Sequence, residues 1–360
     1  MSTATDTPSS RAPGPGPAAQ REPVLSVRDL RTCFEQRHAT VQAVNGVSFD
    51  LHAGETVGLV GESGSGKSVT GYSLLGLIDA PGRIAGGSVR LDGEELVGLS
   101  SQGLRAVRGR RLAMIFQDPM ATLNPVLTIG AQMALALQAH GHVPRAQARA
   151  RCVEVLRQVG IPDADRRLEA WPHQFSGGMR QRVAIAIALL HKPQVIVADE
   201  PTTALDVSIQ AQILTEIHQL VRDSGTALLW ISHDLATVAA IAQRVLVMYA
   251  GRIVEEGPTR AVLKAPRHPY TAGLLGSLPQ SSTPGQPLTQ IPGAPPPLDA
   301  LPAGCSFADR CARAETRCRE QAPPRQSDGE RAWRCHFPLH HADAAAVPPP
   351  PSRAAVAPAP

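Results

Sequence analysis

The stretch Gly61-Glu62-Ser63-Gly64-Ser65-Gly66-Lys67-Ser68 decides how this chain folds, because it has the pattern G-x-x-x-x-G-K-S/T. It lies between an apolar strand pattern at 55–60 and a helix pattern at 69–78. The glycines allow the backbone to turn its N–H groups inward round phosphate oxygens, and the following helix adds the positive end of its dipole. The sequence therefore predicts a phosphate-binding loop, in which Lys67 contacts the β- and γ-phosphates of a nucleotide and Ser68 binds Mg²⁺.

Asp199 and Glu200 follow the apolar run at 195–198, which is typical of a strand buried on both faces. In a nucleotide site, an Asp at such a place can hold Mg²⁺ through water, and the adjacent Glu can orient or deprotonate the attacking water. Two carboxylates after a strand are also found where an ordinary loop starts. Together with the glycine loop, however, the pair is much more specific, and it indicates hydrolysis.

Composition excludes several function classes. Hydrophobic residues make up 43% of the chain and aromatic residues only 3%, so the core must consist mostly of Ala, Val, Leu and Ile. The net charge of +4 is too mild and too evenly spread to indicate a nucleic-acid partner, although it is compatible with an anionic membrane surface. No apolar run approaches the roughly 18 residues of a spanning helix, and the N-terminus lacks the apolar region of a secretory signal. We therefore expect the chain to stay in the cytoplasm.

The order of patterns indicates an α/β domain with a largely parallel core sheet, because strands alternate with helices. We expect this domain to cover 24–265, with a helical subdomain at about 121–185. A small Cys-rich C-terminal domain is expected at 266–338. The Pro-rich ends at 1–22 and 340–360 are expected to be disordered tails. No internal repeat is visible, so the chain has one nucleotide domain.

Phe175-Ser176-Gly177-Gly178-Met179 resembles the signature motif LSGGQ of ABC ATPases, and a helix pattern follows it. The motif departs from the consensus at Phe175 and Met179, whereas Ser176, Gly177 and Gly178 are intact. A Ser hydroxyl, Gly N–H groups and a helix N-terminus form a second anion site. The resemblance implies that these three residues contact the γ-phosphate bound by a partner subunit. It also implies the P-loop fold of the family, with a RecA-like core and a helical subdomain.

Four further residues fall in the order that ABC ATPases show. Gln117 resembles the Q-loop glutamine, which senses Mg²⁺ and the attacking water. Asp206 resembles the D-loop residue at the dimer interface, and His233 resembles the switch histidine that contacts the γ-phosphate. Phe34 resembles the aromatic residue that stacks on adenine. The resemblance covers about 24 to 256 without a gap.

The resemblance thus implies a complete ATP site. Its catalytic residues are expected to be Glu200, His233, Gln117 and Lys67, and Mg²⁺ is expected at Ser68 and Gln117. The residues implied to contact ATP or Mg²⁺ are Phe34, Gly61, Ser63, Gly64, Ser65, Gly66, Lys67, Ser68, Val69, Gln117, Asp199, Glu200 and His233. Contacts to the ATP of a partner subunit are expected from Ser176, Gly177, Gly178 and Asp206.

The C-terminal part of the sequence indicates which subfamily of ABC ATPases the chain resembles. Arg267-His268-Pro269-Tyr270-Thr271 and the cysteines beyond it resemble the extension of the dipeptide/oligopeptide permease ATPases, as do 114–120 and 198–207. Nickel importers and other solute importers share this subfamily, so peptide and small solute both remain open as cargo. Soluble ABC ATPases of translation or DNA repair would need a second P-loop or a long heptad insertion, and the sequence shows neither.

Membership of this subfamily would imply several partners. They are two transmembrane permease subunits, a second ABC ATPase subunit and an extracytoplasmic solute-binding protein. The chain would lie at the cytoplasmic face of the membrane and couple ATP hydrolysis to import.

Four cysteines follow a Pro-rich stretch at 279–302 and have the spacing C-x₅-C-x₆-C-x₁₆-C. Zinc normally takes paired C-x₂₋₄-C knuckles, which are absent, and a disulfide is disfavoured in a reducing cytosol. The resemblance implies a 4Fe–4S cluster, for which four Cys ligands are expected. Zinc and unmetallated thiols remain open. The expected ligands are Cys305, Cys311, Cys318 and Cys335.

Overall fold

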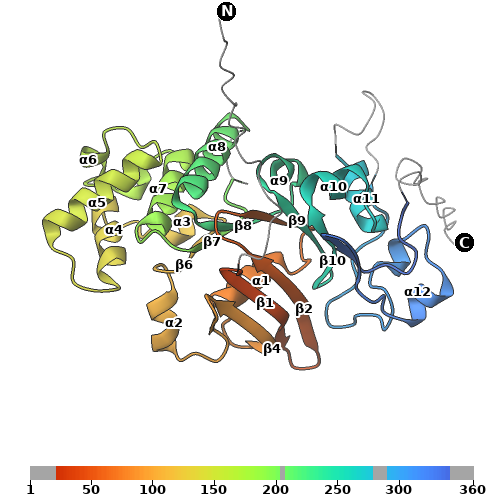
Figure 1. Ribbon diagram of the computed structural model, residues 1–360. Helices are drawn as coiled ribbons and strands as arrows, with labels where there is room; N and C mark the ends of the chain where they lie inside the picture. Colours follow the sequence, from red (N-terminus) through yellow and green to blue (C-terminus); the bar gives the residue numbers. More distant parts are fainter. Residues whose placement is uncertain (1–21, 203–206, 279–289, 341–360) are drawn as a thin grey trace, which may run out of the picture.

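The computed structural model describes residues 22–202, 207–278 and 290–340. Nearly all of both expected tails, part of the Pro-rich stretch and Asp206 lie outside the described residues. Figure 1 shows strands in the middle of the molecule, the helices of the 121–185 region at one end and the segment after 290 at the other. In the described part of the chain, no helix combines the length and apolarity that crossing a membrane requires.

The main sheet has eight strands in the order β11-β12-β10-β9-β3-β8-β7-β6. Its parallel part confirms the expected α/β core, and it consists of β9 (Arg244–Tyr249), β3 (Thr56–Val60), β8 (Ala227–Ser232), β7 (Val195–Asp199) and β6 (Leu112–Ile115). Three strands extend it in antiparallel fashion, namely β10 (Arg252–Pro258), β12 (Arg331–Trp333) and β11 (Gln326–Asp328).

A second, four-stranded antiparallel sheet covers one face of the main sheet. Its strands are β2 (Thr40–Leu51), β1 (Leu25–Glu35), β4 (Gly82–Leu91) and β5 (Glu94–Glu95). Buried side chains of this sheet, such as Val27 and Val89, cluster with Leu59 and Ile231 of the main sheet. Helix α1 (Lys67–Leu74) belongs to the same layer and adds Leu74 to the cluster.

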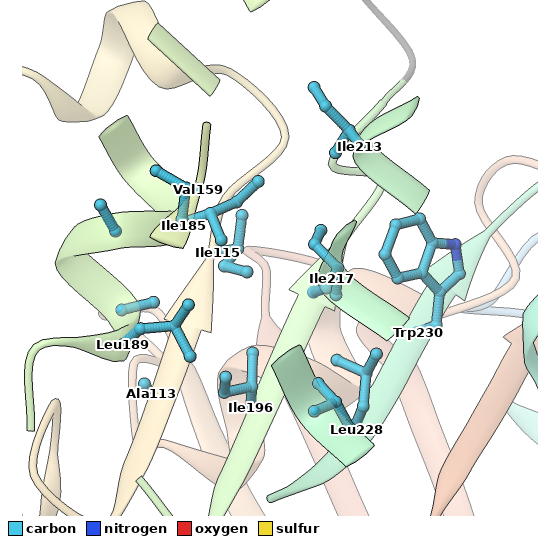
Figure 2. Close-up of a cluster of buried hydrophobic side chains, with 14 of the residues drawn as sticks. Ala113, Ile115, Val159, Ile185, Leu189, Ile196, Ile213, Ile217, Leu228 and Trp230 are labelled. Atoms are coloured by element: carbon cyan, nitrogen blue, oxygen red, sulfur yellow. The ribbon is translucent and has the colours of Figure 1, made fainter. Parts of the chain in front are cut away.

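The other face of the main sheet is covered by α7 (Gly177–Leu189) and α8 (Val207–Ser224). Figure 2 shows Ile185 and Leu189 of α7 and Ile217 of α8 over Ile196 of β7 and Leu228 of β8. Alternate residues of β7, such as Val197, belong to the opposite cluster. Because β7 is buried on both faces, its sequence is a continuous apolar run rather than an alternating one.

The 121–185 region consists mostly of helices, and three of its breaks coincide with prolines or caps. Thr128 caps one helix, Pro144 precedes the next, and Pro172 begins a 3₁₀ turn. The elements are α3 (Pro119–Thr122), α4 (Ile129–Gln138), α5 (Arg145–Gln158), α6 (Ala164–Arg167) and η1 (Pro172–Gln174). Helix α2 (Ser101–Val107) lies before this region, and α9 (Leu235–Ile241) lies between β8 and β9.

The C-terminal segment continues the main sheet. After β10 come α10 (Thr259–Lys264), α11 (Pro269–Gly276), η3 (Ala308–Arg310) and α12 (Thr316–Glu320), and the chain then returns as β11 and β12. Strand β12 pairs with β10 through Glu255 opposite Trp333 and Glu256 opposite Ala332. Residues on both sides of the expected boundary at 265–266 therefore share one sheet.

Glu255 connects these elements from inside. Its side chain is 0% exposed, and its carboxylate accepts hydrogen bonds from the N–H groups of Arg267 at 2.7 Å and His268 at 2.8 Å. Arg331 of β12 adds an ion pair at 3.1 Å. Burial raises the pKa of Glu255, and the two backbone hydrogen bonds oppose that rise. One buried carboxylate thus holds β10, the start of α11 and β12 together.

We expect Glu255→Ala to lower the free energy of unfolding of the full chain by about 3–5 kcal/mol, because Arg331 would remain buried without its counter-charge. Urea denaturation measures this loss. Asp309→Ala is the matched control, since Asp309 is 84% exposed and pairs with Arg319, which is 57% exposed, and it should cost about 1 kcal/mol or less. Equal losses in the two variants would contradict the role of Glu255.

Candidate nucleotide site

The loop between β3 and α1 follows a path that needs glycine. Gly66 has φ of +101°, and a Cβ there would lie 2.1 Å from the carbonyl oxygen of Ala43. A Cβ on Gly61 would lie 2.2 Å from the carbonyl oxygen of Met248. The loop is therefore packed directly against the backbone of β2 and β9, which fixes its position at the end of β3.

Lys67 is buried inside this loop. It is 5% exposed, and its Nζ donates to the carbonyl oxygens of Gly61 and Glu62, both at 2.9 Å. Burial lowers the pKa of Lys67, while the carboxylates of Glu200 and Asp199 act in the opposite direction. Nζ also donates to the Ser65 hydroxyl at 3.4 Å, so its hydrogen-bond acceptors are all neutral, and such a cation is an energetically good partner for a phosphate oxygen.

Asp199 ends β7 directly below the loop. It is 1% exposed, and its Oδ1 accepts a hydrogen bond of 2.9 Å from the Ser68 hydroxyl. Burial raises the pKa of Asp199. No described donor bonds to its buried Oδ2, although the Tyr72 hydroxyl is close enough to act on the pKa. A hydroxyl and a buried carboxylate with a spare oxygen fit Mg²⁺, which prefers oxygen ligands.

Glu200, Gln117 and His233 meet above the ends of β6, β7 and β8. Gln117 Nε2 donates to Glu200 Oε2 at 3.2 Å, and His233 Nδ1 lies 3.1 Å from the same oxygen. Glu200 has φ of +45°, which is uncommon for a residue with a side chain. Its N–H donates to the carbonyl oxygen of Ile231 at 2.9 Å, which ties this conformation to β8. The carboxylate is thus held where it could accept a proton from water.

These groups surround one cavity of about 580 Å³, and most of its lining was predicted from the sequence. The predicted residues that line it are Ser63, Gly64, Gly66, Lys67, Ser68, Val69, Gln117, Glu200 and His233. Ala43 and Leu298 also line it and were not predicted. The carbonyl oxygen of Leu298 accepts a hydrogen bond of 2.9 Å from the N–H of Gln42, which places the C-terminal segment beside β2. A lone Leu after prolines carries no signal of such a contact.

Phe34 is not brought into this cavity. It lies on β1, opposite Gly82 of β4, and a Cβ on Gly82 would lie 2.6 Å from Phe34 Cε1. Phe34 is not among the residues that line the cavity. Gly61 and Ser65 of the loop and Asp199 at the end of β7 do not line the cavity, and Asp206 lies outside the described residues.

The signature residues lie on a separate element. Ser176 caps α7 and its Oγ accepts a hydrogen bond of 3.3 Å from the N–H of Met179. Ser176 and Gly177 are exposed, and neither they nor Gly178 line the cavity. Phe175 is 3% exposed and contributes to the core of the helical region. The departure from the consensus at this position is therefore a core substitution, and the exposed Ser176 and Gly177 match the consensus.

Comparison with known proteins gives the family. A model of the ABC transporter family matches residues 44–203, and one of the oligopeptide/dipeptide transporter C-terminal region matches 254–318. The oligopeptide transport ATP-binding protein OppD of Escherichia coli K12 is 46% identical over 89% of this chain and 95% of its own length. The chain belongs to the ABC transporter ATPases.

Other comparisons agree with this family. The dipeptide transport ATP-binding protein DppD of Bacillus subtilis 168 is 49% identical over 81% of this chain and 87% of its own length. The dimeric ATP-binding cassette MJ0796, solved in a post-hydrolysis state with ADP and phosphate, has a TM-score of 0.59 and 27% identity. It covers 66% of this chain and 99% of its own. The nucleotide-binding α/β fold expected for the ABC ATPase is therefore confirmed, and the protein is an ATPase subunit.

The four C-terminal cysteines of this ABC ATPase line a second, small cavity of about 20 Å³. All four are free thiols, and burial raises the pKa of Cys305 to about 11 and that of Cys335 to about 12. Four neighbouring thiols fit the donor set of a Cys₄ site. Among the described residues, however, no group of three or more His, Cys, Asp or Glu has the arrangement of a metal site.

The burial of Asp199 leads to a prediction about Mg²⁺. Without nucleotide, Asp199→Asn should be at least as stable as the wild type, because a neutral amide avoids the cost of burying a carboxylate. With MgATP at 100 times its Kd, the wild type should gain about 2.7 kcal/mol and the variant much less. Thermal unfolding with and without MgATP measures both. The control is Asp309→Asn, whose carboxylate is 84% exposed; an equal gain in all three proteins would contradict the prediction.

Proposed function

We propose that this ABC ATPase powers the import of di- or oligopeptides across the cytoplasmic membrane. Its curated relatives OppD and DppD are named as oligopeptide and dipeptide transport ATP-binding proteins. The match of 254–318 to the C-terminal region of that transporter family supports the same cargo class. The observation that carries the ATPase part is the carboxylate of Glu200, held between Gln117 and His233 at the edge of the loop cavity.

In this proposal, the residues of the site bind phosphate, bind Mg²⁺ and activate water. Lys67 exchanges the loop carbonyls for oxygens of the β- and γ-phosphates, a charge-assisted and therefore stronger pairing. Ser68 and Gln117 would hold Mg²⁺, and Asp199 would contact it through water; when bound, the ion would neutralise phosphate charge. Glu200 accepts a proton from the attacking water, while Gln117 and His233 fix the orientation of its carboxylate.

The site is completed by a second ATPase subunit. Because Ser176 caps α7 and Gly178 lies in the first turn of that helix, both outside the cavity, their polar groups can face the phosphate of a second subunit. ATP would then lie between Lys67 and His233 of one chain and Ser176 and Gly178 of the other, with Asp206 at the interface. The dimeric state of MJ0796 supports this arrangement.

Further partners follow from the importer assignment. We propose that two permease subunits bind this chain at the cytoplasmic face of the membrane and that an extracytoplasmic protein delivers the solute. ATP binding would close the two ATPase subunits and hydrolysis would release them, which changes the conformation of the permease.

Glu200→Gln tests the role of Glu200. The variant should bind MgATP as the wild type does but hydrolyse it at least about 100-fold more slowly, because an amide cannot accept the proton. It should also accumulate as a closed dimer with ATP. Phosphate release and size-exclusion chromatography measure these two effects.

Glu154→Gln is the control, since this glutamate lies on α5 and is 52% exposed. Its turnover should equal that of the wild type. If Glu200→Gln hydrolysed ATP at a near wild-type rate, Glu200 would not be the proton acceptor.

We also propose that the cysteine segment, which we define as residues 305–335, holds a 4Fe–4S cluster. Support comes from the four thiols, which line one cavity. Their number equals the number of Cys ligands that a 4Fe–4S cluster takes. The ligands would be Cys305, Cys311, Cys318 and Cys335. A metal in this segment would add binding energy to folding, since so short a segment has little apolar area of its own.

Anaerobic purification followed by iron, sulfide and zinc analysis tests the cluster. About four iron and four sulfide per chain are expected for a 4Fe–4S cluster, together with a brown colour. Cys318→Ser should lose them, whereas Cys152→Ser, which removes a buried thiol on α5, should keep them. A colourless, iron-free protein loaded with zinc would contradict the proposal.

A further inference from the structure

Arg310 connects the cysteine segment directly to the phosphate loop. It belongs to η3, between Cys305 and Cys311. Its two terminal nitrogens bind the carboxylate of Glu62, the second residue of the loop, with Nη1–Oε2 at 2.6 Å and Nη2–Oε1 at 2.9 Å. This paired geometry fixes the orientation of both side chains.

The guanidinium is held on its other sides as well. Arg310 Nε donates to the carbonyl oxygen of Pro292 at 2.8 Å, and Nη1 donates to the hydroxyl of Tyr249 at 3.2 Å. The aromatic rings of Tyr249 and Phe307 lie 5.7 and 5.9 Å from the guanidinium carbon. The Arg310 side chain is 5% exposed. It therefore presents its charge to Glu62 from a fixed position.

Glu62 is contacted by the C-terminal segment at a second point. Its N–H donates to the hydroxyl of Tyr270, on α11, at 2.8 Å. Its carbonyl oxygen accepts the hydrogen bond from Lys67, and its carboxylate acts on the pKa of that lysine. Glu62 is thus contacted both by the cysteine segment and by Lys67.

If the contact between Arg310 and Glu62 only held the two segments together, it would not need charged side chains. Replacing a buried ion pair by apolar residues often leaves a protein equally stable or more stable. The pair does, however, neutralise a carboxylate beside Lys67, and this carboxylate would otherwise compete with phosphate for the ammonium group and repel the nucleotide. The pair therefore matters more for the charge of the loop than for the stability of the fold.

We propose that Arg310 is a positioning residue for the phosphate loop: it neutralises and fixes Glu62, so that tight nucleotide binding requires the folded cysteine segment. This inference rests on the proposed function only in that the loop binds ATP. It gives the C-terminal segment a direct effect on nucleotide affinity, exerted through one side chain.

Isothermal titration of the full-length chain with MgATP tests this proposal. Arg310→Met should weaken binding about tenfold, because Glu62 is left as an unpaired anion beside Lys67. Glu62→Gln combined with Arg310→Met should restore most of the affinity, since the unpaired charge is gone. In ATPase assays, the KM of Arg310→Met should rise by a similar factor while kcat stays near the wild-type value.

Two further variants complete the experiment. Arg319→Met is the control, because Arg319 lies in the same segment but is 57% exposed and pairs with Asp309; its affinity should equal that of the wild type. Arg310→Lys keeps the positive charge opposite Glu62 but loses the two parallel hydrogen bonds, so it should bind MgATP less tightly than the wild type and more tightly than Arg310→Met. This variant serves if Arg310→Met does not fold.

The outcomes distinguish an effect of Arg310 on nucleotide affinity from an effect on folding. Wild-type affinity in Arg310→Met would overturn the proposal. A loss that Glu62→Gln does not restore, accompanied by a lower melting temperature without nucleotide, would overturn it as well, because the effect would then come from folding. If the wild type itself did not bind MgATP, the assignment of the loop as an ATP site would be wrong.

Discussion

Lys67 carries a positive charge into a position where only 5% of its surface meets solvent. An ammonium group there must be compensated, and in this chain the compensation comes from two carbonyl oxygens of the loop and from the field of Glu200, Asp199 and Glu62. The loop glycines, which allow the carbonyls to point at Nζ, and β7, which ends at Asp199 and is followed by Glu200, together compensate this one charge. The cavity exists because these groups surround the lysine without filling the space beside it.

Parallel strands explain why so much of the site could be predicted from the sequence. β3, β7 and β8 end at the same edge of the sheet, so the residues after each strand meet although they are far apart in the chain. The apolar runs of these strands are clear signals, and the structure brings most of the residues predicted after them to one cavity. The position of a side chain can be predicted where local pattern and sheet geometry together determine it.

The contributions of the C-terminal segment could not be predicted in this way. β11 and β12 have three residues each, which is too short for an alternating pattern. The pairing of Arg310 with Glu62 joins residues 248 positions apart, and neither residue stands out in the sequence. Leu298 follows prolines and looks like part of a linker. Phe34 was expected to stack on adenine because of its place in the family pattern, and in the structure its side chain lies near Gly82 of the neighbouring strand, outside the cavity lining.

The pairing of β12 with β10 limits how this protein can be shortened. Smaller cassettes such as MJ0796 align with only 66% of the chain, which suggests that the remainder could be trimmed. A chain cut after 278 would, however, leave the backbone of Glu255 and Glu256 as an open sheet edge and remove the arginine that neutralises a fully buried carboxylate. Open edges of this kind pair with other chains. Domain truncation would therefore yield an aggregating fragment rather than a minimal ATPase, because the C-terminal segment shares a sheet and a buried ion pair with β10.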